Sequence, residues 1–318
     1  MTARARAGST GWLGAGLIAL AAVCFGTLGP ITRFADDAGV GSLAIVAWRA
    51  AIGATAMLLV LLALRGAAGR RPLSLGDVPP RDRRFIGAAS LANLVLNLAM
   101  FIAFVRVEIG LALLVFYSYP AFVALASVIW FGDRLDAVRW LALGLSMLGL
   151  TLTLSGSGGV GTLDALGIGL SFLAALTQAF YVLSARHGFA RIPPVEAAAT
   201  TMGGAAVGYL VIALVTGQLV SLGAPLASGQ ALGLVLIAGL IGAAIPTVCF
   251  ITGIRLLGAP RAAILATLEP VVGVALAAWL LGEQPALLQL AGGALILLAA
   301  VLLQVGGTTA ADHEAVSG

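Results

Sequence analysis

The feature that most constrains this chain is an apolar segment of about twenty residues that recurs from one end to the other. That length lets one helix cross the hydrocarbon core of a bilayer, and a segment in lipid must pair its own backbone polar groups. Charges and Pro/Gly clusters separate ten such segments. The sequence therefore predicts an all-α integral membrane protein with ten transmembrane helices, at residues 12–32, 41–64, 85–105, 110–131, 137–155, 164–185, 195–217, 231–254, 261–281 and 286–305.

Composition agrees with a chain whose solvent is mostly lipid. Hydrophobic residues make up 61% of the sequence and charged residues only 9%, which is too little polar surface for a water-soluble domain of 318 residues. Two arginines precede the first segment, as in a signal peptide. Its apolar run is too long for one and nine more segments follow, so we expect it to be retained as a helix.

The arginines predict the orientation, since the chain has no lysine. Only Arg33 and Arg106 fall outside if the N-terminus is cytoplasmic. The positive-inside rule therefore predicts that both termini are cytoplasmic, with these arginines on that side: Arg4, Arg6, Arg65, Arg70, Arg71, Arg81, Arg83, Arg84, Arg134, Arg139, Arg186, Arg191, Arg255 and Arg261.

This distribution also explains the basic net charge. No compact basic domain with interleaved aromatic residues is present, so we expect membrane lipid and not nucleic acid as a partner. Arginine without lysine, together with 42 glycines, is typical of a GC-rich bacterial genome. The expected location is the bacterial cytoplasmic (inner) membrane.

The chain also repeats itself on either side of a glycine-rich connector at 156–163. We divide it there into two five-helix repeats, 1–158 and 159–318. Because five is odd, the second repeat enters the membrane from the opposite side, which predicts an inverted repeat around a central cavity with a site near the midplane. A shift of 150 residues aligns Pro120 with Pro270, Gly132 with Gly282, Asp133 with Glu283, and Asn97 with Thr247.

Signs of catalysis are few. The two histidines, His187 and His313, lie in a loop and in the polar tail, and no HExxH, GxSxG or CxxC pattern occurs. We therefore expect neither an enzyme nor a bound cofactor or metal. Gly204 and Gly208 form a GxxxG pattern, which favours close helix packing over dimerisation, and the oligomeric state stays open.

Glu269 is the most informative residue. It lies eight residues inside its span, roughly 12 Å deep at 1.5 Å per residue, where a charge costs about 2.5–3.5 kcal/mol. Pro270 follows, so we expect the helix to kink or open here and to leave carbonyls unpaired. Glu269 then either holds a cation, a proton or an amino group, or only ties down the broken helix. The equivalent residue of the first half is Tyr119, before Pro120.

Other polar side chains within the spans are candidates for the same site. For each of them, helix-to-helix hydrogen bonding is the alternative to ligand contact. Arg49 reads more simply as an ion pair or carbonyl clamp, and we class it with the two prolines as structural. The substrate-binding candidates are Glu269, Tyr119, Asn97, Thr247, Gln178 and Tyr181, and the structural candidates are Pro120, Pro270 and Arg49.

Three stretches carry a resemblance to a known family. LEPVVGVALAAWLLGEQPALLQLAGGALIL, its weaker copy YSYPAFVALASVIWFGDRLDAVRWLALGLSMLG, and AWRAAIG resemble the EamA-type transporters of the drug/metabolite transporter superfamily. The resemblance spans almost the whole chain. It implies ten helices in two inverted halves around a central cavity, and export of small metabolites, often amino acids. This chain has Asp133 where the pattern usually has glutamate, and Tyr119 in place of an acid before Pro120.

Our leading hypothesis is an exporter of amino acids or related small metabolites that works by alternating access. The alternative within transport is a multidrug exporter of lipophilic cations, which the low aromatic content of 7% disfavours. A membrane enzyme or a non-transporting membrane protein is a third possibility, from a different class. It would need a catalytic cluster or a large soluble loop, and the sequence has neither.

Overall fold

The computed structural model describes residues 2–68, 78–104, 106–107, 109–133, 135–155, 164–281 and 285–314. The predicted connector, with its boundary between 158 and 159, and the pair Gly282 and Glu283 lie outside them. The helices of the first half are α1 (Thr2–Gly26), α2 (Leu28–Asp37), α3 (Ser42–Ala68), α4 (Pro80–Phe104), α5 (Ile109–Phe116), α6 (Tyr119–Phe131) and α7 (Ala137–Ser155).

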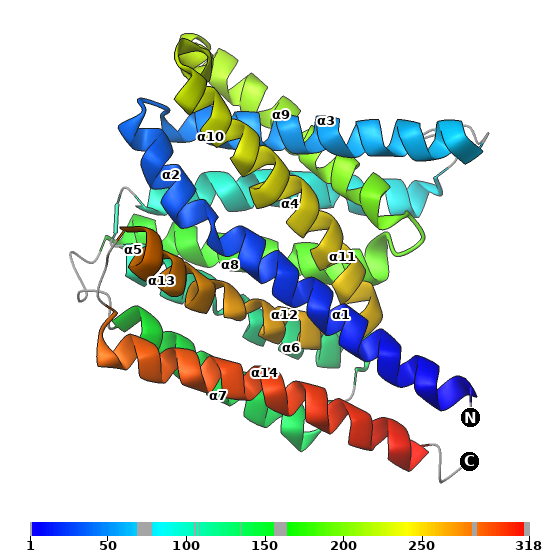
Figure 1. Ribbon diagram of the computed structural model, residues 1–318. Coiled ribbons are helices and arrows are strands. Elements are labelled where there is room, and N and C mark those ends of the chain that lie inside the picture. Colours follow the sequence, from blue (N-terminus) through cyan, green and yellow to red (C-terminus); the bar gives the residue numbers. More distant parts are fainter. Residues whose placement is uncertain are drawn as a thin grey trace.

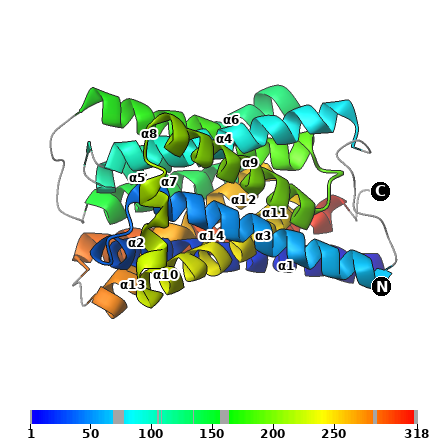
Figure 2. The ribbon, with the colours of Figure 1, turned by 90° about the horizontal axis from the view of Figure 1, so that it is seen from above.

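The second half contains α8 (Ala165–Leu183), the π-helical turn η1 (Ser184–Gly188), α9 (Pro194–Val215), the 3-10 segment η2 (Val220–Ala227), α10 (Gly229–Gly239), the π-helical turn η3 (Leu240–Ala244), α11 (Ile245–Leu257), α12 (Ala259–Ala266), α13 (Leu268–Leu281) and α14 (Leu287–Glu314). Each of the ten predicted segments is helical. Among the described residues, six segments are long and apolar enough to cross a membrane by themselves. The helices run between the same two ends of the bundle, and α1 begins where α14 ends (Figures 1 and 2).

Three spans are broken by a turn into two helices, at α1/α2, α5/α6 and α12/α13, whereas the eighth span stays helical and passes from α10 to α11 through the π-helical turn η3. A proline stands in the first turn of each second helix, where its missing N–H would be unpaired in any case. Its ring would clash with a carbonyl one turn earlier if the first helix continued, so the regular α-helix must be interrupted before it. These prolines are Pro30, Pro120, Pro246 and Pro270.

At each of the three turns a side-chain hydroxyl forms a hydrogen bond with the backbone. Thr27, Ser118 and Thr267 each donate to the carbonyl three residues earlier, over 2.6, 2.6 and 2.7 Å. In lipid a freed carbonyl must find a partner within the protein. The side chain supplies it, so a break can persist in the membrane.

The break in the ninth span differs from our expectation. The turn falls at Thr267, and Glu269 lies beyond it in the first turn of α13. We expected carbonyls to be left unpaired at the break, but that of Ile264 accepts hydrogen bonds from the backbone N–H and the hydroxyl of Thr267. The proline acts one turn upstream of itself, because its ring excludes a helical carbonyl four residues before it.

Helix pairing follows the symmetry of an inverted repeat. The most extensive contacts join α7 to α14, α3 to α9, α1 to α11 and α4 to α8. Exchange of the two halves turns the pair of α1 and α11 into the pair of α8 and α4. The pair of α3 and α9 and the pair of α7 and α14 are each turned into themselves. An internal twofold axis produces this pattern, and Figure 1 shows α7 and α14 side by side at one edge of the bundle.

Glycines allow close approach at two helix pairs, α7 with α14 and α4 with α9. A β-carbon at Gly149 of α7 would lie 2.6 Å from the carbonyl oxygen of Gly292 in α14, so the two backbones touch. In α9, a β-carbon at Gly204 would meet Ser90, and one at Gly208 would meet Leu94, both in α4. The GxxxG pattern therefore serves packing within the chain, as the sequence favoured.

The two ends of the interior are packed differently. At the end where α1 begins, α12 packs against α6, and Leu265 and Ala126 are buried. The equivalent helices at the other end are α5 and α13, which have no comparable packing in the described part of the chain. Val115 and Leu276, the counterparts of the two buried residues, are partly exposed. The interior is thus closed at the end of the termini and looser at the other.

The second half begins with a capped helix. The Asp164 carboxylate accepts hydrogen bonds from the backbone N–H groups of Leu166 and Gly167 at the start of α8. It also accepts one from Arg106 at 2.9 Å. The hydrogen bond from Arg106, followed by those from the helix, lowers the pKa of Asp164. The cap is therefore at full strength above the ordinary pKa of an aspartate and is lost only as the pH falls through the lowered value.

Candidate functional site

Glu269 lies where two helix fragments meet inside the bundle. It occupies the first turn of α13, where the helix dipole favours a negative charge. Its side chain is only half-buried, although α12 before it is buried almost throughout. The Tyr117 hydroxyl, from the break between α5 and α6, lies within reach of its carboxylate. A carboxylate held in this way is accessible from within the protein.

Aromatic rings from the first-half break form one wall beside this carboxylate. Tyr117 and Tyr119 are each 2% exposed, and their ring centroids are 6.1 Å apart. Phe116 packs on both, at 5.1 and 5.5 Å. The Tyr119 hydroxyl lies close to Glu269 and to the amide of Gln178 in α8. Tyr119 thus links its own half to two polar groups of the other half.

Arg49 approaches Glu269 from α3. Its Nη2 donates to Asn97 Oδ1 at 2.8 Å, and Asn97 Nδ2 donates in turn to the Asn93 carbonyl at 2.7 Å. The Tyr209 hydroxyl, from α9, donates to the Leu94 carbonyl at 3.5 Å and lies near Asn97 and Arg49. Arg49 is therefore held by α4 and approached by α9.

The two charges nevertheless stop short of an ion pair. Arg49 and Glu269 are close enough to interact electrostatically. The ion pairs found among the described residues, with nitrogen and oxygen within 4.0 Å, lie elsewhere, at Arg106–Asp164 and Arg139–Asp136. A cation and an anion thus face each other across the interface between the halves without touching.

Six side chains from both halves converge here, and we call them the central group. Arg49, Asn97, Tyr117 and Tyr119 come from the first half, and Gln178 and Glu269 from the second. Of the residues that the sequence singled out, Tyr181 and Thr247 lie apart from the group. Tyr181 is one turn beyond Gln178, next to Thr201 and Arg255. Thr247 is half-buried in the first turn of α11, and no hydrogen bond among the described residues involves its side chain.

The sequence analysis did not include Tyr117 among the site candidates and did not consider Tyr209. A signal was available for both. The chain has four tyrosines, all of them within predicted spans, and each is at most 3% exposed in the structure. A buried tyrosine needs a partner for its hydroxyl, so a tyrosine in a span marks a polar place in the interior.

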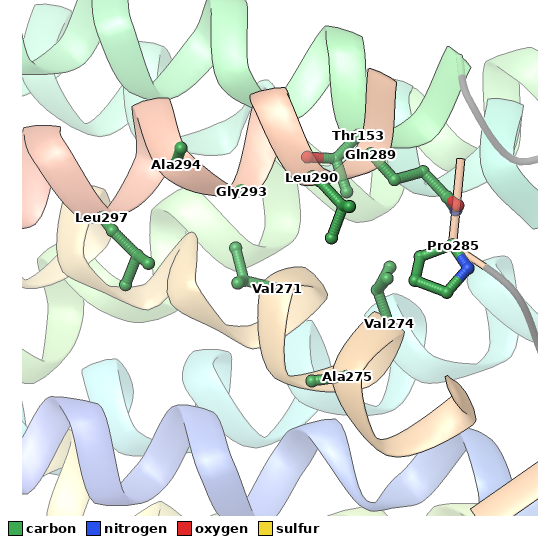
Figure 3. A pocket seen from close by; sticks show the side chains of 10 residues that line it. All are labelled: Thr153, Val271, Val274, Ala275, Pro285, Gln289, Leu290, Gly293, Ala294 and Leu297. Carbon is green, nitrogen blue, oxygen red and sulfur yellow. The ribbon is translucent and has the colours of Figure 1, made fainter. Parts of the chain in front are cut away.

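A cavity of about 240 Å³ lies elsewhere, between α13 and α14 with Thr153 of α7 (Figure 3). Val271, Val274 and Leu297 contribute apolar walls, and Gln289 and Thr153 are the polar side chains on its rim. None of the central group lines it. An apolar cavity between two membrane-spanning helices suits hydrocarbon better than a polar metabolite, so we do not assign the site to it.

Comparison with known proteins covers most of the chain. Residues 12–155 and 165–305 each match the sequence profile of the EamA-like transporter family. An uncharacterized transporter of Archaeoglobus fulgidus is 29% identical over 291 residues, which cover 91% of this chain and 95% of that protein. An uncharacterized transporter of Synechocystis sp. is 29% identical over 212 residues, 64% of this chain and 61% of that protein.

The fold is also found in a solved crystal structure. That structure superimposes with a TM-score of 0.77 over 92% of this chain and 97% of its own, at 19% sequence identity. Such a match concerns the fold alone. With the helix pairing and the two profile matches, it confirms the predicted multi-span helical protein built from two inverted halves.

Proposed function

We propose, from the premise that this chain belongs to the EamA-like transporter family, that it exports amino acids or related small metabolites by alternating access. The family makes it a multi-pass membrane transporter. The substrate class is our proposal. It rests on Arg49 and Glu269, whose opposite charges face each other.

Arg49 and Glu269 suit a molecule that bears both charges. A guanidinium binds a carboxylate through two parallel hydrogen bonds, and a glutamate accepts from an ammonium group. Because Arg49 and Glu269 interact without an ion pair, a zwitterion placed between them would satisfy both. Gln178, Asn97 and the tyrosines supply further polar contacts. An amino acid has this charge arrangement at neutral pH.

The packing of the two ends supports alternating access. The seam of α6 and α12 is closed at the end of the termini, while its counterpart of α5 and α13 is loose. Inverted halves can exchange these arrangements, which would close the second seam and open the first. A substrate between Arg49 and Glu269 would then face first one side of the membrane and then the other.

A second candidate function has one observation in its favour. Phe116, Tyr117 and Tyr119 gather beside Glu269 with ring centroids 5.1–6.1 Å apart. Aromatic faces together with a carboxylate attract organic cations. Export of lipophilic cations would use this wall and Glu269, and it would not need Arg49.

We propose that the protein lies in a bacterial cytoplasmic membrane with both termini in the cytoplasm. The side of the membrane that carries most of the arginines is the side of the termini, and the positive-inside rule assigns that side to the cytoplasm. A reporter that fluoresces only in the cytoplasm, fused after the last residue, should be bright. A periplasmic phosphatase fused at the same point should be inactive. The reverse result would contradict the orientation.

The substrate class can be tested in vesicles that contain the purified protein and a panel of metabolites, read by mass spectrometry. Zwitterions should move, and both Glu269→Gln and Arg49→Gln should lose this flux. Asp37→Asn, which removes an exposed carboxylate at the end of α2, is the matched control and should transport normally. Glu269→Gln should also abolish transport driven by a proton gradient while the protein still folds.

The same vesicles separate the two candidates. Cationic dyes that move normally in Arg49→Gln but not in Glu269→Gln would favour the lipophilic-cation function. A panel in which no zwitterion moves would overturn the proposal, and so would zwitterion flux at the original rate in Glu269→Gln.

A further inference from the structure

Buried polar atoms without partners gather at the closed end of the bundle. Among the described residues they include Asp82 Oδ2, Ser127 Oγ, Tyr181 Oη, His187 Nε2 and Arg255 Nε. These residues lie near the start of α4, in α6, at the end of α8, in η1 and in the last turn of α11, all toward the end where α1 begins. A buried donor or acceptor without a partner destabilises the packing that hides it.

Arg255 and Tyr181 are the pair that can act together. They are close enough to interact electrostatically, and Tyr181 is only 3% exposed. Arg255 donates from Nη2 to the Phe189 carbonyl at 3.1 Å, which fixes the guanidinium and leaves Nε unused. The Tyr181 hydroxyl lies beside Thr201 without a hydrogen bond of good geometry. Two buried donors without a hydrogen-bond partner therefore lie near each other, one in α8 and one in α11.

Two acids at the same end are engaged elsewhere, and Asp82, whose Oδ2 is buried without a partner, does not act on Arg255. Asp133 interacts with His187, and Asp136 with Arg139 and Arg261. In the part of the chain that the structure describes, no carboxylate pairs with Arg255. A cation with an unused donor, next to a free hydroxyl and without an acid, is suited to an anion from outside the protein.

We propose that Arg255 and Tyr181 form a second binding subsite, for the carboxylate of the transported molecule, which becomes accessible when the end of the termini opens. The proposal rests on the zwitterionic substrate and the alternating access proposed above. In the closed arrangement the two donors are hidden and unpaired. Opening the seam of α6 and α12 would expose them, and a carboxylate would supply the missing acceptor.

The position of the subsite fits an entrance to the central group. Tyr181 follows Gln178 by three residues in α8, which places it roughly 4.5 Å further along the helix axis. Gln178 contacts Tyr119, which lies beside Glu269. A carboxylate released by Arg255 would therefore have polar groups one turn away on the path toward Arg49.

The subsite can be tested by cysteine protection in the full-length protein. Cys24 and Cys249 are replaced by alanine, and Thr201→Cys places a thiol beside Tyr181. A membrane-impermeant maleimide is added on the side of the termini, with sodium acetate or with sodium chloride at equal ionic strength. Acetate should slow labelling several-fold, and Arg255→Gln should abolish this protection.

Two variants and a test of folding control the result. Arg191→Gln removes an exposed arginine from the same end and should keep full protection. Arg255→Lys keeps the charge without the planar fork and should keep part of it. Equal elution of all variants in size-exclusion chromatography shows that they fold. No protection by acetate, equal protection in Arg255→Gln, or equal protection by sodium sulfate would each overturn the carboxylate subsite.

Flux measurements add a second, independent result. Arg255→Gln should raise the KM for substrate on the side of the termini about tenfold, which corresponds to one lost charge-assisted hydrogen bond. The apparent affinity on the opposite side should not change. The protection experiment with acetate uses no transported molecule, so its result remains valid even if no metabolite of the panel is transported. Conversely, zwitterion flux without protection by acetate would contradict the proposed subsite but not the proposed function.

Discussion

At the residue scale, one pair of equivalent positions explains how two similar halves make an asymmetric site. Pro120 and Pro270 are equivalent, and each begins a second helix fragment. The residues before them differ, since Tyr119 stands in one half and Glu269 in the other. The shared proline makes the same break twice, while the tyrosine and the glutamate give that break an aromatic wall on one side and a charge on the other.

Asn97 carries the first prediction. Its carboxamide holds the Arg49 guanidinium at 2.8 Å, so Asn97→Ala should let Arg49 turn away from the substrate. We expect KM to rise about tenfold with little change in kcat, as for loss of one hydrogen bond to a charged group. Flux at several substrate concentrations measures both quantities.

Asn93→Ala is the matched control on the same face of α4. The strong bond from Asn97 goes to the Asn93 backbone carbonyl at 2.7 Å, and the side-chain oxygen of Asn93 is 3.4 Å away. The alanine keeps the carbonyl, so its effect should be smaller. An equal rise of KM in the two variants would argue that α4 as a whole, and not Asn97, positions Arg49.

At the element scale, the broken spans are local features with a distant consequence. A proline in the first turn of α13 and the Thr267 hydroxyl keep α12 and α13 separate, and the separation turns Glu269 toward Tyr117. The sequence predicted this break from Pro270 alone. It did not place the turn at Thr267, because a proline excludes a carbonyl one turn earlier and the hydroxyl that stabilises the turn works from there.

Pro270→Ala is the second prediction. Alanine would let α12 continue into α13 as one helix, which moves Glu269 away from the tyrosines. Transport should fall by an order of magnitude or more, with the Tm unchanged or slightly raised, because alanine favours a continuous helix by up to about 3 kcal/mol. Vesicle flux and thermal unfolding in detergent check the two parts. A variant that transports normally would show that the break does not position Glu269.

At the scale of the whole molecule, the halves are joined through helix pairs that cross between them. The backbones of α7 and α14 meet closely at Gly149 and Gly292. Because α7 and α14 map onto each other under the twofold axis, this pair forms part of the interface around which the halves would move. A defect there should affect the assembly of the entire bundle.

Gly149→Leu is the third prediction. The new side chain has no room against the Gly292 carbonyl, so α7 and α14 must separate, at a cost of about 1–3 kcal/mol or more. The Tm should fall by several degrees. Gly144→Leu is the matched control, since it lies exposed on the same helix with nothing within 4 Å of an added β-carbon. Equal melting of the two variants would contradict the backbone contact.

The sequence by itself predicted the ten helices, the break at Pro270 and the presence of two halves. These depend on the length of an apolar run and on the steric effect of a proline, which are local properties. It also pointed to Glu269, because a charged residue inside an apolar segment can be recognised from the sequence alone and costs free energy to bury. The glutamate's role, however, depends on which groups surround it.

Only the tertiary structure decided those surroundings. Arg49 meets Asn97 because α3 and α4 both pack on α9, and Tyr209 reaches them from that helix, more than a hundred residues away. Tyr181 lay on the predicted face of α8, yet it joins Arg255 and not the central group. Helical periodicity gives the face on which a side chain lies. Which helix covers that face depends on small residues and packed surfaces far apart in the sequence, and these meet only when the chain is folded.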